Sequence, residues 1–238
     1  IDDKFPTHKW GGLAFSKTRG NLLWVPLIEK AYAKMYGSYS NIIGGNVNEA
    51  LSDLTGAPCE RIELDEVELD SELTFARLVS FRKSEFLMGA SCGNSEAKQN
   101  RYKNVGLQMD HAYSILDVQL VENPGGKEAL KLVKLRNPWG SFEWKGAWSD
   151  SSREWRDNPE IAKNLKYKNS NDGVFWMSYH DLLLYFRSID VCKLRSNWQQ
   201  RQIDCQWSHS GLHSEFMYEV VTSVRTWMTL SVIQPDMR

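Results

Sequence analysis

The sequence predicts an α+β protein in which helices come first and a β-rich region follows. Apolar residues recur at helical spacing before residue 56, polar and apolar residues alternate after it, and Gly-rich turns separate the alternating runs. The pattern changes at residues 55–58, so we expect a helical part over 1–56 and a β-rich part over 57–195. Two short β-rich runs, 218–224 and 226–232, predict that a further domain begins within 196–238.

Three helices are expected. The first spans 23–36, the second begins after Asn46 and ends at Gly56, and the third spans 72–82. Asn46 and Glu49 have the spacing of a capping box at the start of the second helix. The first helix carries an apolar stripe made of Leu27, Ile28, Ala31, Tyr32 and Met35.

A β-hairpin is expected next. The run HAYSILDVQLVE from His111 ends at a Pro-Gly-Gly turn at 124–126, and residues 131–136 alternate before Asn137. Pairing of these runs would bring His111 and Asn137 to the same end of the sheet. An imidazole held by an amide oxygen is two thirds of a Cys-His-Asn catalytic apparatus. Spacing alone also allows another interpretation, in which His111 is a core or surface histidine and Asn137 caps a turn before Pro138.

The cysteines do not complete this apparatus. Cys59 and Cys92 precede His111, but neither opens a helix whose N-terminus could stabilise a thiolate. Cys192 and Cys205 follow Asn137. We therefore interpret all four as structural or free thiols.

Composition excludes several classes of protein. A net charge of −1 from 29 basic and 30 acidic residues argues against nucleic-acid partners. No apolar run approaches the roughly 20 residues of a membrane span. Four cysteines without framework spacing suggest a reducing compartment, so we expect a cytoplasmic protein, and we expect no organic cofactor.

Six motifs occur in an order that identifies a family: GNLLWVPLIEKAYAKMYGSY (20–39), GGNVNEALSDLTG (44–56), DHAYS, LRNPWG, EWKGAWSDSSREW (143–155) and DGVFWMSYHDLLLYF (172–186). Together, over residues 1–195, they resemble the later part of the papain-like core of calpain cysteine proteases. FLMGASCG (86–93), HAYSILDV and SIDVCKL (188–194) resemble the small-optic-lobes branch, which lacks an EF-hand tail.

The resemblance implies an intracellular cysteine endopeptidase that acts on proteins or peptides. His111 would be the general base, Asn137 its orienting residue, and Trp139 a cover over their hydrogen bond. The nucleophilic Cys would lie on an upstream segment, so we expect a fragment that is inactive alone. Residues 196–238 would be a linker and the first strands of a β-sandwich. The alternative is a non-catalytic calpain-like protein that binds peptides or serves as a scaffold.

The resemblance also allows for Ca²⁺. Glu143, Asp150 and Asp172 fall at acidic positions of one calpain calcium site, and Glu49 falls at a position of another. Val174 stands where many calpains have a further carboxylate, so any binding should be weak. Asp110 is a second departure, since the family commonly has a small residue there; its carboxylate would raise the pKa of His111 or simply face water.

Overall fold

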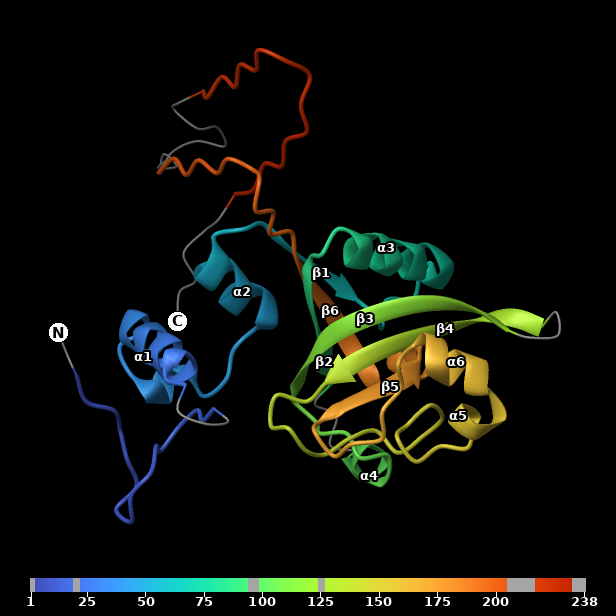
Figure 1. Cartoon of the computed structure of the whole chain (residues 1–238). Helices are drawn as coiled ribbons and strands as arrows, with labels where there is room; N and C mark the ends of the chain where they lie inside the picture. Colours follow the sequence, from blue (N-terminus) through green and yellow to red (C-terminus); the bar gives the residue numbers. More distant parts are fainter. Residues whose placement is uncertain (1–2, 19–21, 94–98, 124–126, 205–216, 233–238) are drawn as a thin grey trace. The chain divides into compact units, whose positions relative to one another are not determined.

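The computed structural model describes residues 3–18, 22–93, 99–123, 127–204 and 217–232 and divides into two compact units, 1–50 and 51–238. The first unit contains helix α1 (Trp24–Met35) and the 3-10 helix η1 (Tyr39–Ile42) (Figure 1). Helix α2 (Val47–Thr55) begins in the first unit and ends in the second. Helices α1 and α2 thus lie within one or two residues of the expected ranges, and α2 ends at Thr55, directly before the expected stop at Gly56.

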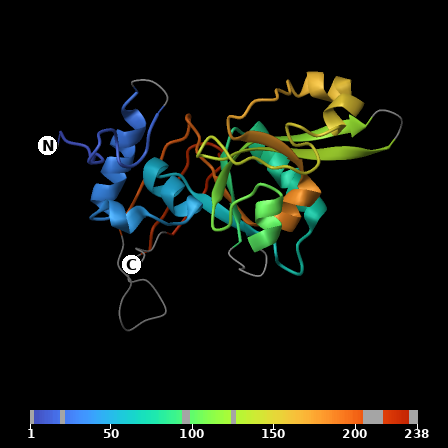
Figure 2. The ribbon, with the colours of Figure 1, turned by 90° about the horizontal axis from the view of Figure 1, so that it is seen from below.

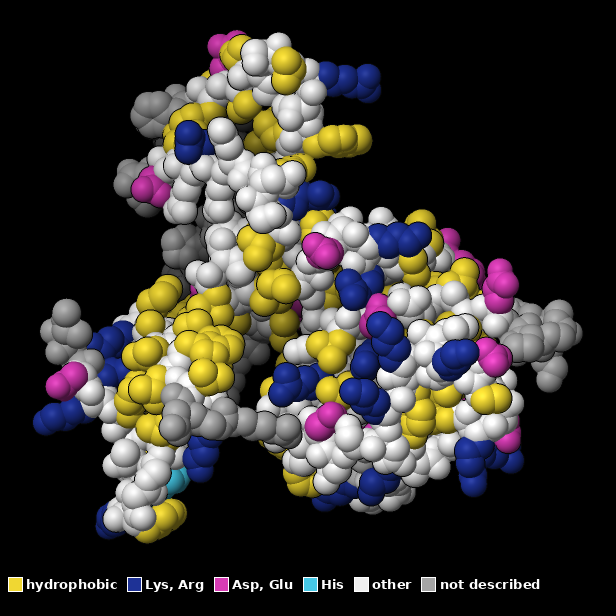
Figure 3. Space-filling model, viewed as in Figure 1, with side chains coloured by type: hydrophobic (Ala, Val, Ile, Leu, Met, Phe, Trp, Pro, Cys, Tyr) yellow, Lys and Arg dark blue, Asp and Glu magenta, His cyan; other side chains and the backbone are white. Residues whose placement is uncertain are grey.

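The apolar stripe of α1 is largely exposed. Leu27, Ile28 and Met35 are 52%, 44% and 67% exposed, and apolar side chains gather on the surface of this unit (Figure 3). The buried positions of α1 are instead Pro26, Lys30 and Ala33. An amphipathic helix buries only the face that another element covers.

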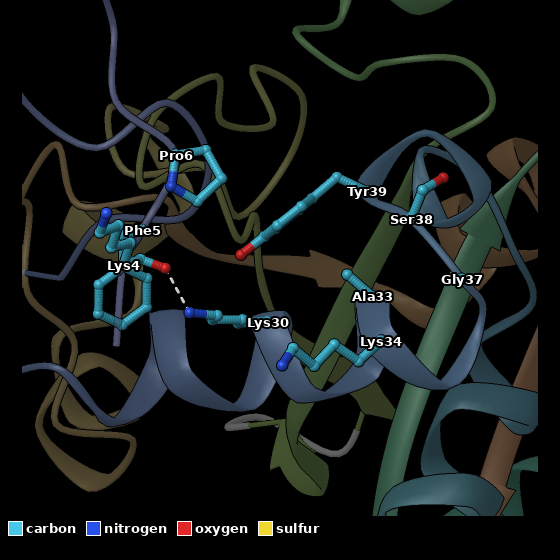
Figure 4. A pocket seen from close by; sticks show the side chains of 9 residues that line it. All are labelled: Lys4, Phe5, Pro6, Lys30, Ala33, Lys34, Gly37, Ser38 and Tyr39. Carbon is cyan, nitrogen blue, oxygen red and sulfur yellow. Dashed lines mark hydrogen bonds between the residues drawn. The ribbon is translucent and has the colours of Figure 1, made fainter. Parts of the chain in front are cut away.

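The buried face of α1 lies against residues 4–6, with a pocket of about 300 Å³ between them (Figure 4). Lys30 reaches into this space and donates a hydrogen bond to the carbonyl oxygen of Lys4. Its ammonium lies 5.1 Å from the centroid of the Phe5 ring. Because a lysine is seldom buried unless its ammonium has partners, these contacts explain why this face of α1 is turned inward.

Unit 2 is built on a six-stranded antiparallel sheet with the order β1-β6-β2-β3-β4-β5. The strands are β1 (Cys59–Glu63), β2 (Leu87–Cys92), β3 (Ala112–Asn123), β4 (Lys127–Arg136), β5 (Val174–Ser178) and β6 (Phe186–Cys192). Strands β3 and β4 form the expected hairpin, and in Figures 1 and 2 it extends past its neighbours. The turn at 124–126 lies outside the described residues.

The helices of unit 2 are α3 (Ser71–Lys83), α4 (Gln99–Asn104), α5 (Glu154–Asp157), α6 (Pro159–Asn164) and α7 (Tyr179–Tyr185). Helix α3 lies within a residue of its expected range at each end. Asp70 caps it, since the Asp70 carboxylate accepts a hydrogen bond from the Leu73 amide. The sequence did not predict the four shorter helices, because helices of only four to seven residues show too little periodicity.

Two hydrophobic clusters hold the sheet. The larger one joins Phe75 and Leu78 of α3 and Leu182 of α7 to alternate sheet residues such as Val133. The smaller one contains three tryptophans, and its sheet residues are Leu132 and Trp176. Neighbouring residues of a strand point to opposite faces, so the clusters pack on opposite sides of β4. The helices and loops on both faces hold the β3–β4 hairpin in place.

The expected strands near the end of the chain are not formed. Residues 218–224 and 226–232 contain no strand, and Val221, Trp227 and Leu230 are largely exposed. Their alternating pattern suits a strand, but a strand also needs a neighbour that pairs with its backbone. The described residues offer none, so the β-sandwich assigned to 196–238 stays a prediction.

Candidate active site

His111 and Asn137 lie at the same end of the β3–β4 hairpin. His111 directly precedes β3, and Asn137 directly follows β4. Each is also tied to the strand beyond the hairpin: the His111 carbonyl accepts a hydrogen bond from the Cys92 amide at 3.0 Å, and the Asn137 amide donates to the Gly173 carbonyl at 2.8 Å. Backbone bonds to β2 and to the start of β5 therefore fix both residues.

The two side chains are hydrogen-bonded. His111 Nε2 and Asn137 Oδ1 are 2.9 Å apart, and Asn137 has no exposed surface. The Asn137 amide is oriented from both ends: its Nδ2 donates to the Phe142 carbonyl at 3.1 Å, and its Oδ1 accepts from the Trp139 amide at 3.1 Å. Because Oδ1 can only accept, Nε2 must carry the proton. In the neutral imidazole, Nδ1 is then an unprotonated base.

Two aromatic rings border the imidazole. The Trp139 ring centroid lies 4.2 Å from that of His111 at an angle of 42°, and the Tyr113 ring meets it edge-on at 5.0 Å. Tyr113 is buried, whereas Trp139 is 59% exposed. Trp139 thus lies beside the His111–Asn137 pair while its outer surface faces solvent. The other tryptophans of the 136–155 segment, Trp144, Trp148 and Trp155, are packed in the two clusters.

Asp110 faces water. Its side chain is exposed, and its backbone has a φ of +48°, which turns the chain just before His111. Of the two interpretations of this residue, the position favours the solvent-facing one.

Gly173 is a positioning residue that the motif spacing did not reveal. Its φ is +83°, and a Cβ built there would lie 2.8 Å from the Asn137 carbonyl oxygen and 2.8 Å from Gly140 Cα. Only a residue without a side chain lets the backbone come this close. Gly173 therefore allows the contact that holds the Asn137 backbone. The Asp172-Gly173 pair was visible in the sequence, but nothing there linked it to Asn137.

The three described cysteines are free thiols, as expected, and all lie in the sheet. Burial raises the pKa of Cys59 to about 12, and burial also raises the pKa of Cys92. A nucleophilic cysteine needs the opposite shift, because the thiolate is the reactive form. Within the described residues, none of these thiols is hydrogen-bonded to His111. Cys205 lies outside those residues.

The acidic residues Glu143, Asp150 and Asp172 come from neighbouring loops. Glu143 Oε1 accepts hydrogen bonds from the amides of Asp172, at 2.9 Å, and Gly173, at 2.7 Å. Asp150 Oδ2 accepts from the Ser170 amide at 2.9 Å. Burial raises the pKa of Asp150 to about 6, and the charges of Glu143 and Asp172 add to this effect.

These carboxylates do not form a prepared metal site. Across the parts of the chain that the structure describes, no three His, Cys, Asp or Glu side chains are grouped so that they could hold an ion. Asp172 uses one oxygen for the Val174 amide and the other for the Ser170 hydroxyl. Glu49 accepts a hydrogen bond from the Tyr36 hydroxyl at 3.2 Å, within unit 1.

Comparison with known proteins decides the family. The model for the calpain family of cysteine proteases matches residues 1–193. The chain belongs to the calpain family. It is 39% identical over 214 residues to "Calpain-type cysteine protease DEK1" of Arabidopsis thaliana, 38% over 200 residues to "Calpain clp-1" of Caenorhabditis elegans, and 37% over 196 residues to "Calpain-9" of Mus musculus.

These calpain matches cover 87%, 82% and 82% of the chain, but only 10%, 24% and 28% of the relatives. The chain therefore spans a small part of the curated calpains it matches. The expected α+β architecture of a calpain core agrees with the observed helices and antiparallel sheet. Within the described ranges, no helix is long and apolar enough to cross a membrane.

Proposed function

We propose that the protein containing this chain is a calpain-type cysteine endopeptidase, with His111 as general base and Asn137 as the residue that orients it. The observation that carries the proposal is the 2.9 Å bond between His111 Nε2 and the buried Asn137 Oδ1. This bond holds one imidazole nitrogen in the protonated form and leaves Nδ1 available to a thiol.

The nucleophile would be a cysteine outside residues 1–238, because the described thiols have no bond to His111 and two have raised pKa values. Its thiol proton would pass to Nδ1, and the thiolate would attack the carbonyl carbon of a peptide bond. Nδ1–H would then protonate the departing amine, leaving an acyl-enzyme. Finally, Nδ1 would take a proton from water as the water attacks the thioester.

In this mechanism Asn137 does not exchange a proton. Its oxygen lowers the energy of the imidazolium that forms in each step and keeps the ring in one orientation. Trp139 supports this role in two ways: its amide donates to the same Asn137 oxygen, and its ring lies against the imidazole. A partly covered hydrogen bond is stronger than one in open water, because the local dielectric is lower.

Kinetics of the full-length protein on an unfolded protein or peptide reporter test the proposal. We expect His111→Ala to reduce kcat by at least about 10⁴-fold and Asn137→Ala to have a loss roughly 100-fold smaller, as for the third member of a triad. His180→Ala, which removes an exposed histidine from α7, is the matched control and should keep full activity. A folded His111→Ala protein with wild-type kcat would rule out His111 as the base. A folded wild-type protein that binds peptide without cutting it would favour the non-catalytic alternative.

We further propose that any Ca²⁺ binding by this part of the protein is weak, with a Kd of roughly 10⁻⁴ to 10⁻³ M. Glu143, Asp150 and Asp172 would supply the carboxylates. Burial is the main cause that raises the pKa of Asp150, and the charges of Glu143 and Asp172 add to it; this repulsion among the carboxylates supports an affinity for a cation, while the hydrogen bonds already made by all three oppose it. Glu143 also accepts a hydrogen bond from the Gly173 amide, so an ion bound here would lie close to the residue whose carbonyl holds the Asn137 backbone.

Two finer assignments are part of the same proposal. The motifs at 86–93 and 188–194 support placement in the small-optic-lobes branch. Free thiols in the described sheet support a reducing, cytoplasmic compartment. Protein substrates follow from peptidase activity.

A further inference from the structure

Cys59 and Cys192 face one another across the antiparallel pair β1–β6. Cys59 is the first residue of β1, which is an edge strand, and Cys192 is the last residue of β6. Both are free thiols. Cys192 is fully buried, whereas Cys59 is partly exposed. We call these two residues the Cys59–Cys192 pair.

The backbone hydrogen bonds between β1 and β6 show whether the Cys59–Cys192 pair occupies a hydrogen-bonded or a non-hydrogen-bonded position. Lys193 donates to the Pro58 carbonyl at 2.9 Å at one end, and Leu64 donates to the Arg187 carbonyl at 2.7 Å at the other. Hydrogen-bonded positions alternate along an antiparallel ladder, so the pair occupies a non-hydrogen-bonded position. Cα atoms at such positions are about 4.5 Å apart, within the roughly 4.4–6.8 Å that a disulfide spans.

The side chains also interact. The two residues are directly opposed in the register, so their side chains project from the same face of the sheet. Burial is the main cause that raises the pKa of Cys59, and the charge of the neighbouring Cys192 thiolate adds to it. The Cys59 thiol donates a hydrogen bond to the Ala57 carbonyl oxygen at 3.6 Å. The Cys192 sulfur also lies 3.4 Å from the Thr55 hydroxyl. Cys92 differs, because its raised pKa comes from burial alone.

We propose that the Cys59–Cys192 pair is an oxidation site that forms an intrachain disulfide in the presence of a peroxide. Cys59, the more accessible thiol, reduces hydrogen peroxide, giving a sulfenic acid and one water. The Cys192 sulfur then attacks the Cys59 sulfur, the S–S bond forms, and the hydroxyl leaves as a second water. Two thiols and one peroxide thus give one disulfide and two waters, and a thiol reductant reverses the change.

The bond would fasten the edge strand β1 to β6 where the chain enters and leaves the sheet. Residues 56–58 lead from α2 into β1, and Lys193 follows β6 directly. Disulfide formation should be slow at neutral pH, because the raised pKa of Cys59 keeps it in the less reactive thiol form. The site therefore suits sustained oxidation rather than rapid peroxide sensing.

Peptide mass spectrometry on the folded chain tests this proposal. The chain is treated with hydrogen peroxide, quenched in acid, alkylated after denaturation, and digested without reductant. We expect a Cys59 peptide joined to a Cys192 peptide as the main oxidised product, and its loss on later reduction. Oxidation in concentrated urea is the control for proximity, since the unfolded chain should give mixed pairings of its four cysteines.

Variants separate this pair from the other thiols. Cys59→Ser, Cys192→Ser and Cys192→Ala should each abolish the linked product, while Cys92→Ser and Cys205→Ser should leave it. The readout on the unmodified chain stands even if a Cys192 variant fails to fold. A linked peptide that contains Cys92 or Cys205 as the main native product would overturn the proposal. Recovery of Cys59 and Cys192 as separate alkylated or over-oxidised residues would also overturn it.

Discussion

Replacing Gly173 by alanine should weaken the backbone hydrogen bond that holds Asn137 in place. The added Cβ would lie 2.8 Å from both the Asn137 carbonyl oxygen and Gly140 Cα, which is closer than real Cβ contacts occur. Both neighbours are backbone atoms, so neither can move aside by changing a rotamer. The backbone of the Asn137 turn must shift instead, and the bond from the Asn137 amide to the Gly173 carbonyl lengthens.

The loss of stability caused by Gly173→Ala has two parts, backbone strain and steric overlap. Alanine in the left-handed region costs about 1–2 kcal/mol, and forcing an extra methyl into a packed site costs about 1–3 kcal/mol. Gly140→Ala is the matched control, because Gly140 has a φ of +69° but its Cβ would meet only the Asp172 carbonyl oxygen at 3.8 Å. Gly140→Ala should therefore cost only the backbone strain of about 1–2 kcal/mol. Gly173→Ala should therefore destabilise the chain by about 2–5 kcal/mol, roughly 1–3 kcal/mol more than Gly140→Ala.

Urea unfolding of residues 1–238, followed by tryptophan fluorescence, measures both variants. With slopes of about 1–3 kcal/mol per molar urea, the midpoint of Gly173→Ala should lie below that of Gly140→Ala by about 1 M. Equal midpoints for the two variants would show that the close approach at Gly173 does not constrain the Asn137 turn. The steric part of the reasoning would then be wrong.

Three further predictions follow from the site. Burial raises the folded-state pKa of Asp150 to about 6 from an unfolded value of about 3.9, so its ionisation lowers stability as pH rises through this window. Asp150→Asn should therefore raise the free energy of unfolding at pH 7 by on the order of 1 kcal/mol after allowance for exposure, seen as a higher melting temperature, and should leave it unchanged near pH 4. An equal gain at both pH values would exclude this charge effect. Millimolar Ca²⁺ should raise the melting temperature of the wild-type chain but not of Asp150→Ala, and isothermal titration showing submicromolar binding, or no heat at several millimolar, would contradict the weak site. Residues 1–238 alone should not hydrolyse a peptide reporter; hydrolysis abolished by alkylation at Cys59 or Cys92 would reverse that expectation.

The sequence predicted the hairpin well because both of its signals are local. Alternating residues on either side of a Pro-Gly-Gly turn specify strand pairing, and pairing places the ends of β3 and β4 together. The proximity of His111 and Asn137 follows from that register. The support from Gly173 could not be predicted, because it depends on the close approach of β5, which is far away in the sequence.

Two patterns in the sequence are not matched by burial or pairing in the described residues, because a pattern does not specify its partner. The apolar stripe of α1 has the right spacing for burial, yet the helix turns Lys30 inward, since that side chain bonds the Lys4 carbonyl. Residues 218–224 alternate like a strand, but a strand forms only beside another. In both cases the sequence shows which side chains could be buried, and tertiary contacts decide which ones are.

The central claim is that Asn137 holds the His111 imidazole with its proton on Nε2 and leaves Nδ1 free. Nitrogen NMR of the histidine rings in residues 1–238, at about pH 8.5, where a neutral imidazole can be observed, tests this most directly. The account predicts a protonated Nε2 and an unprotonated Nδ1 for His111, and a loss of this preference in Asn137→Ala. A His111 ring that carries its proton on Nδ1, or that is unaffected by Asn137→Ala, would contradict it.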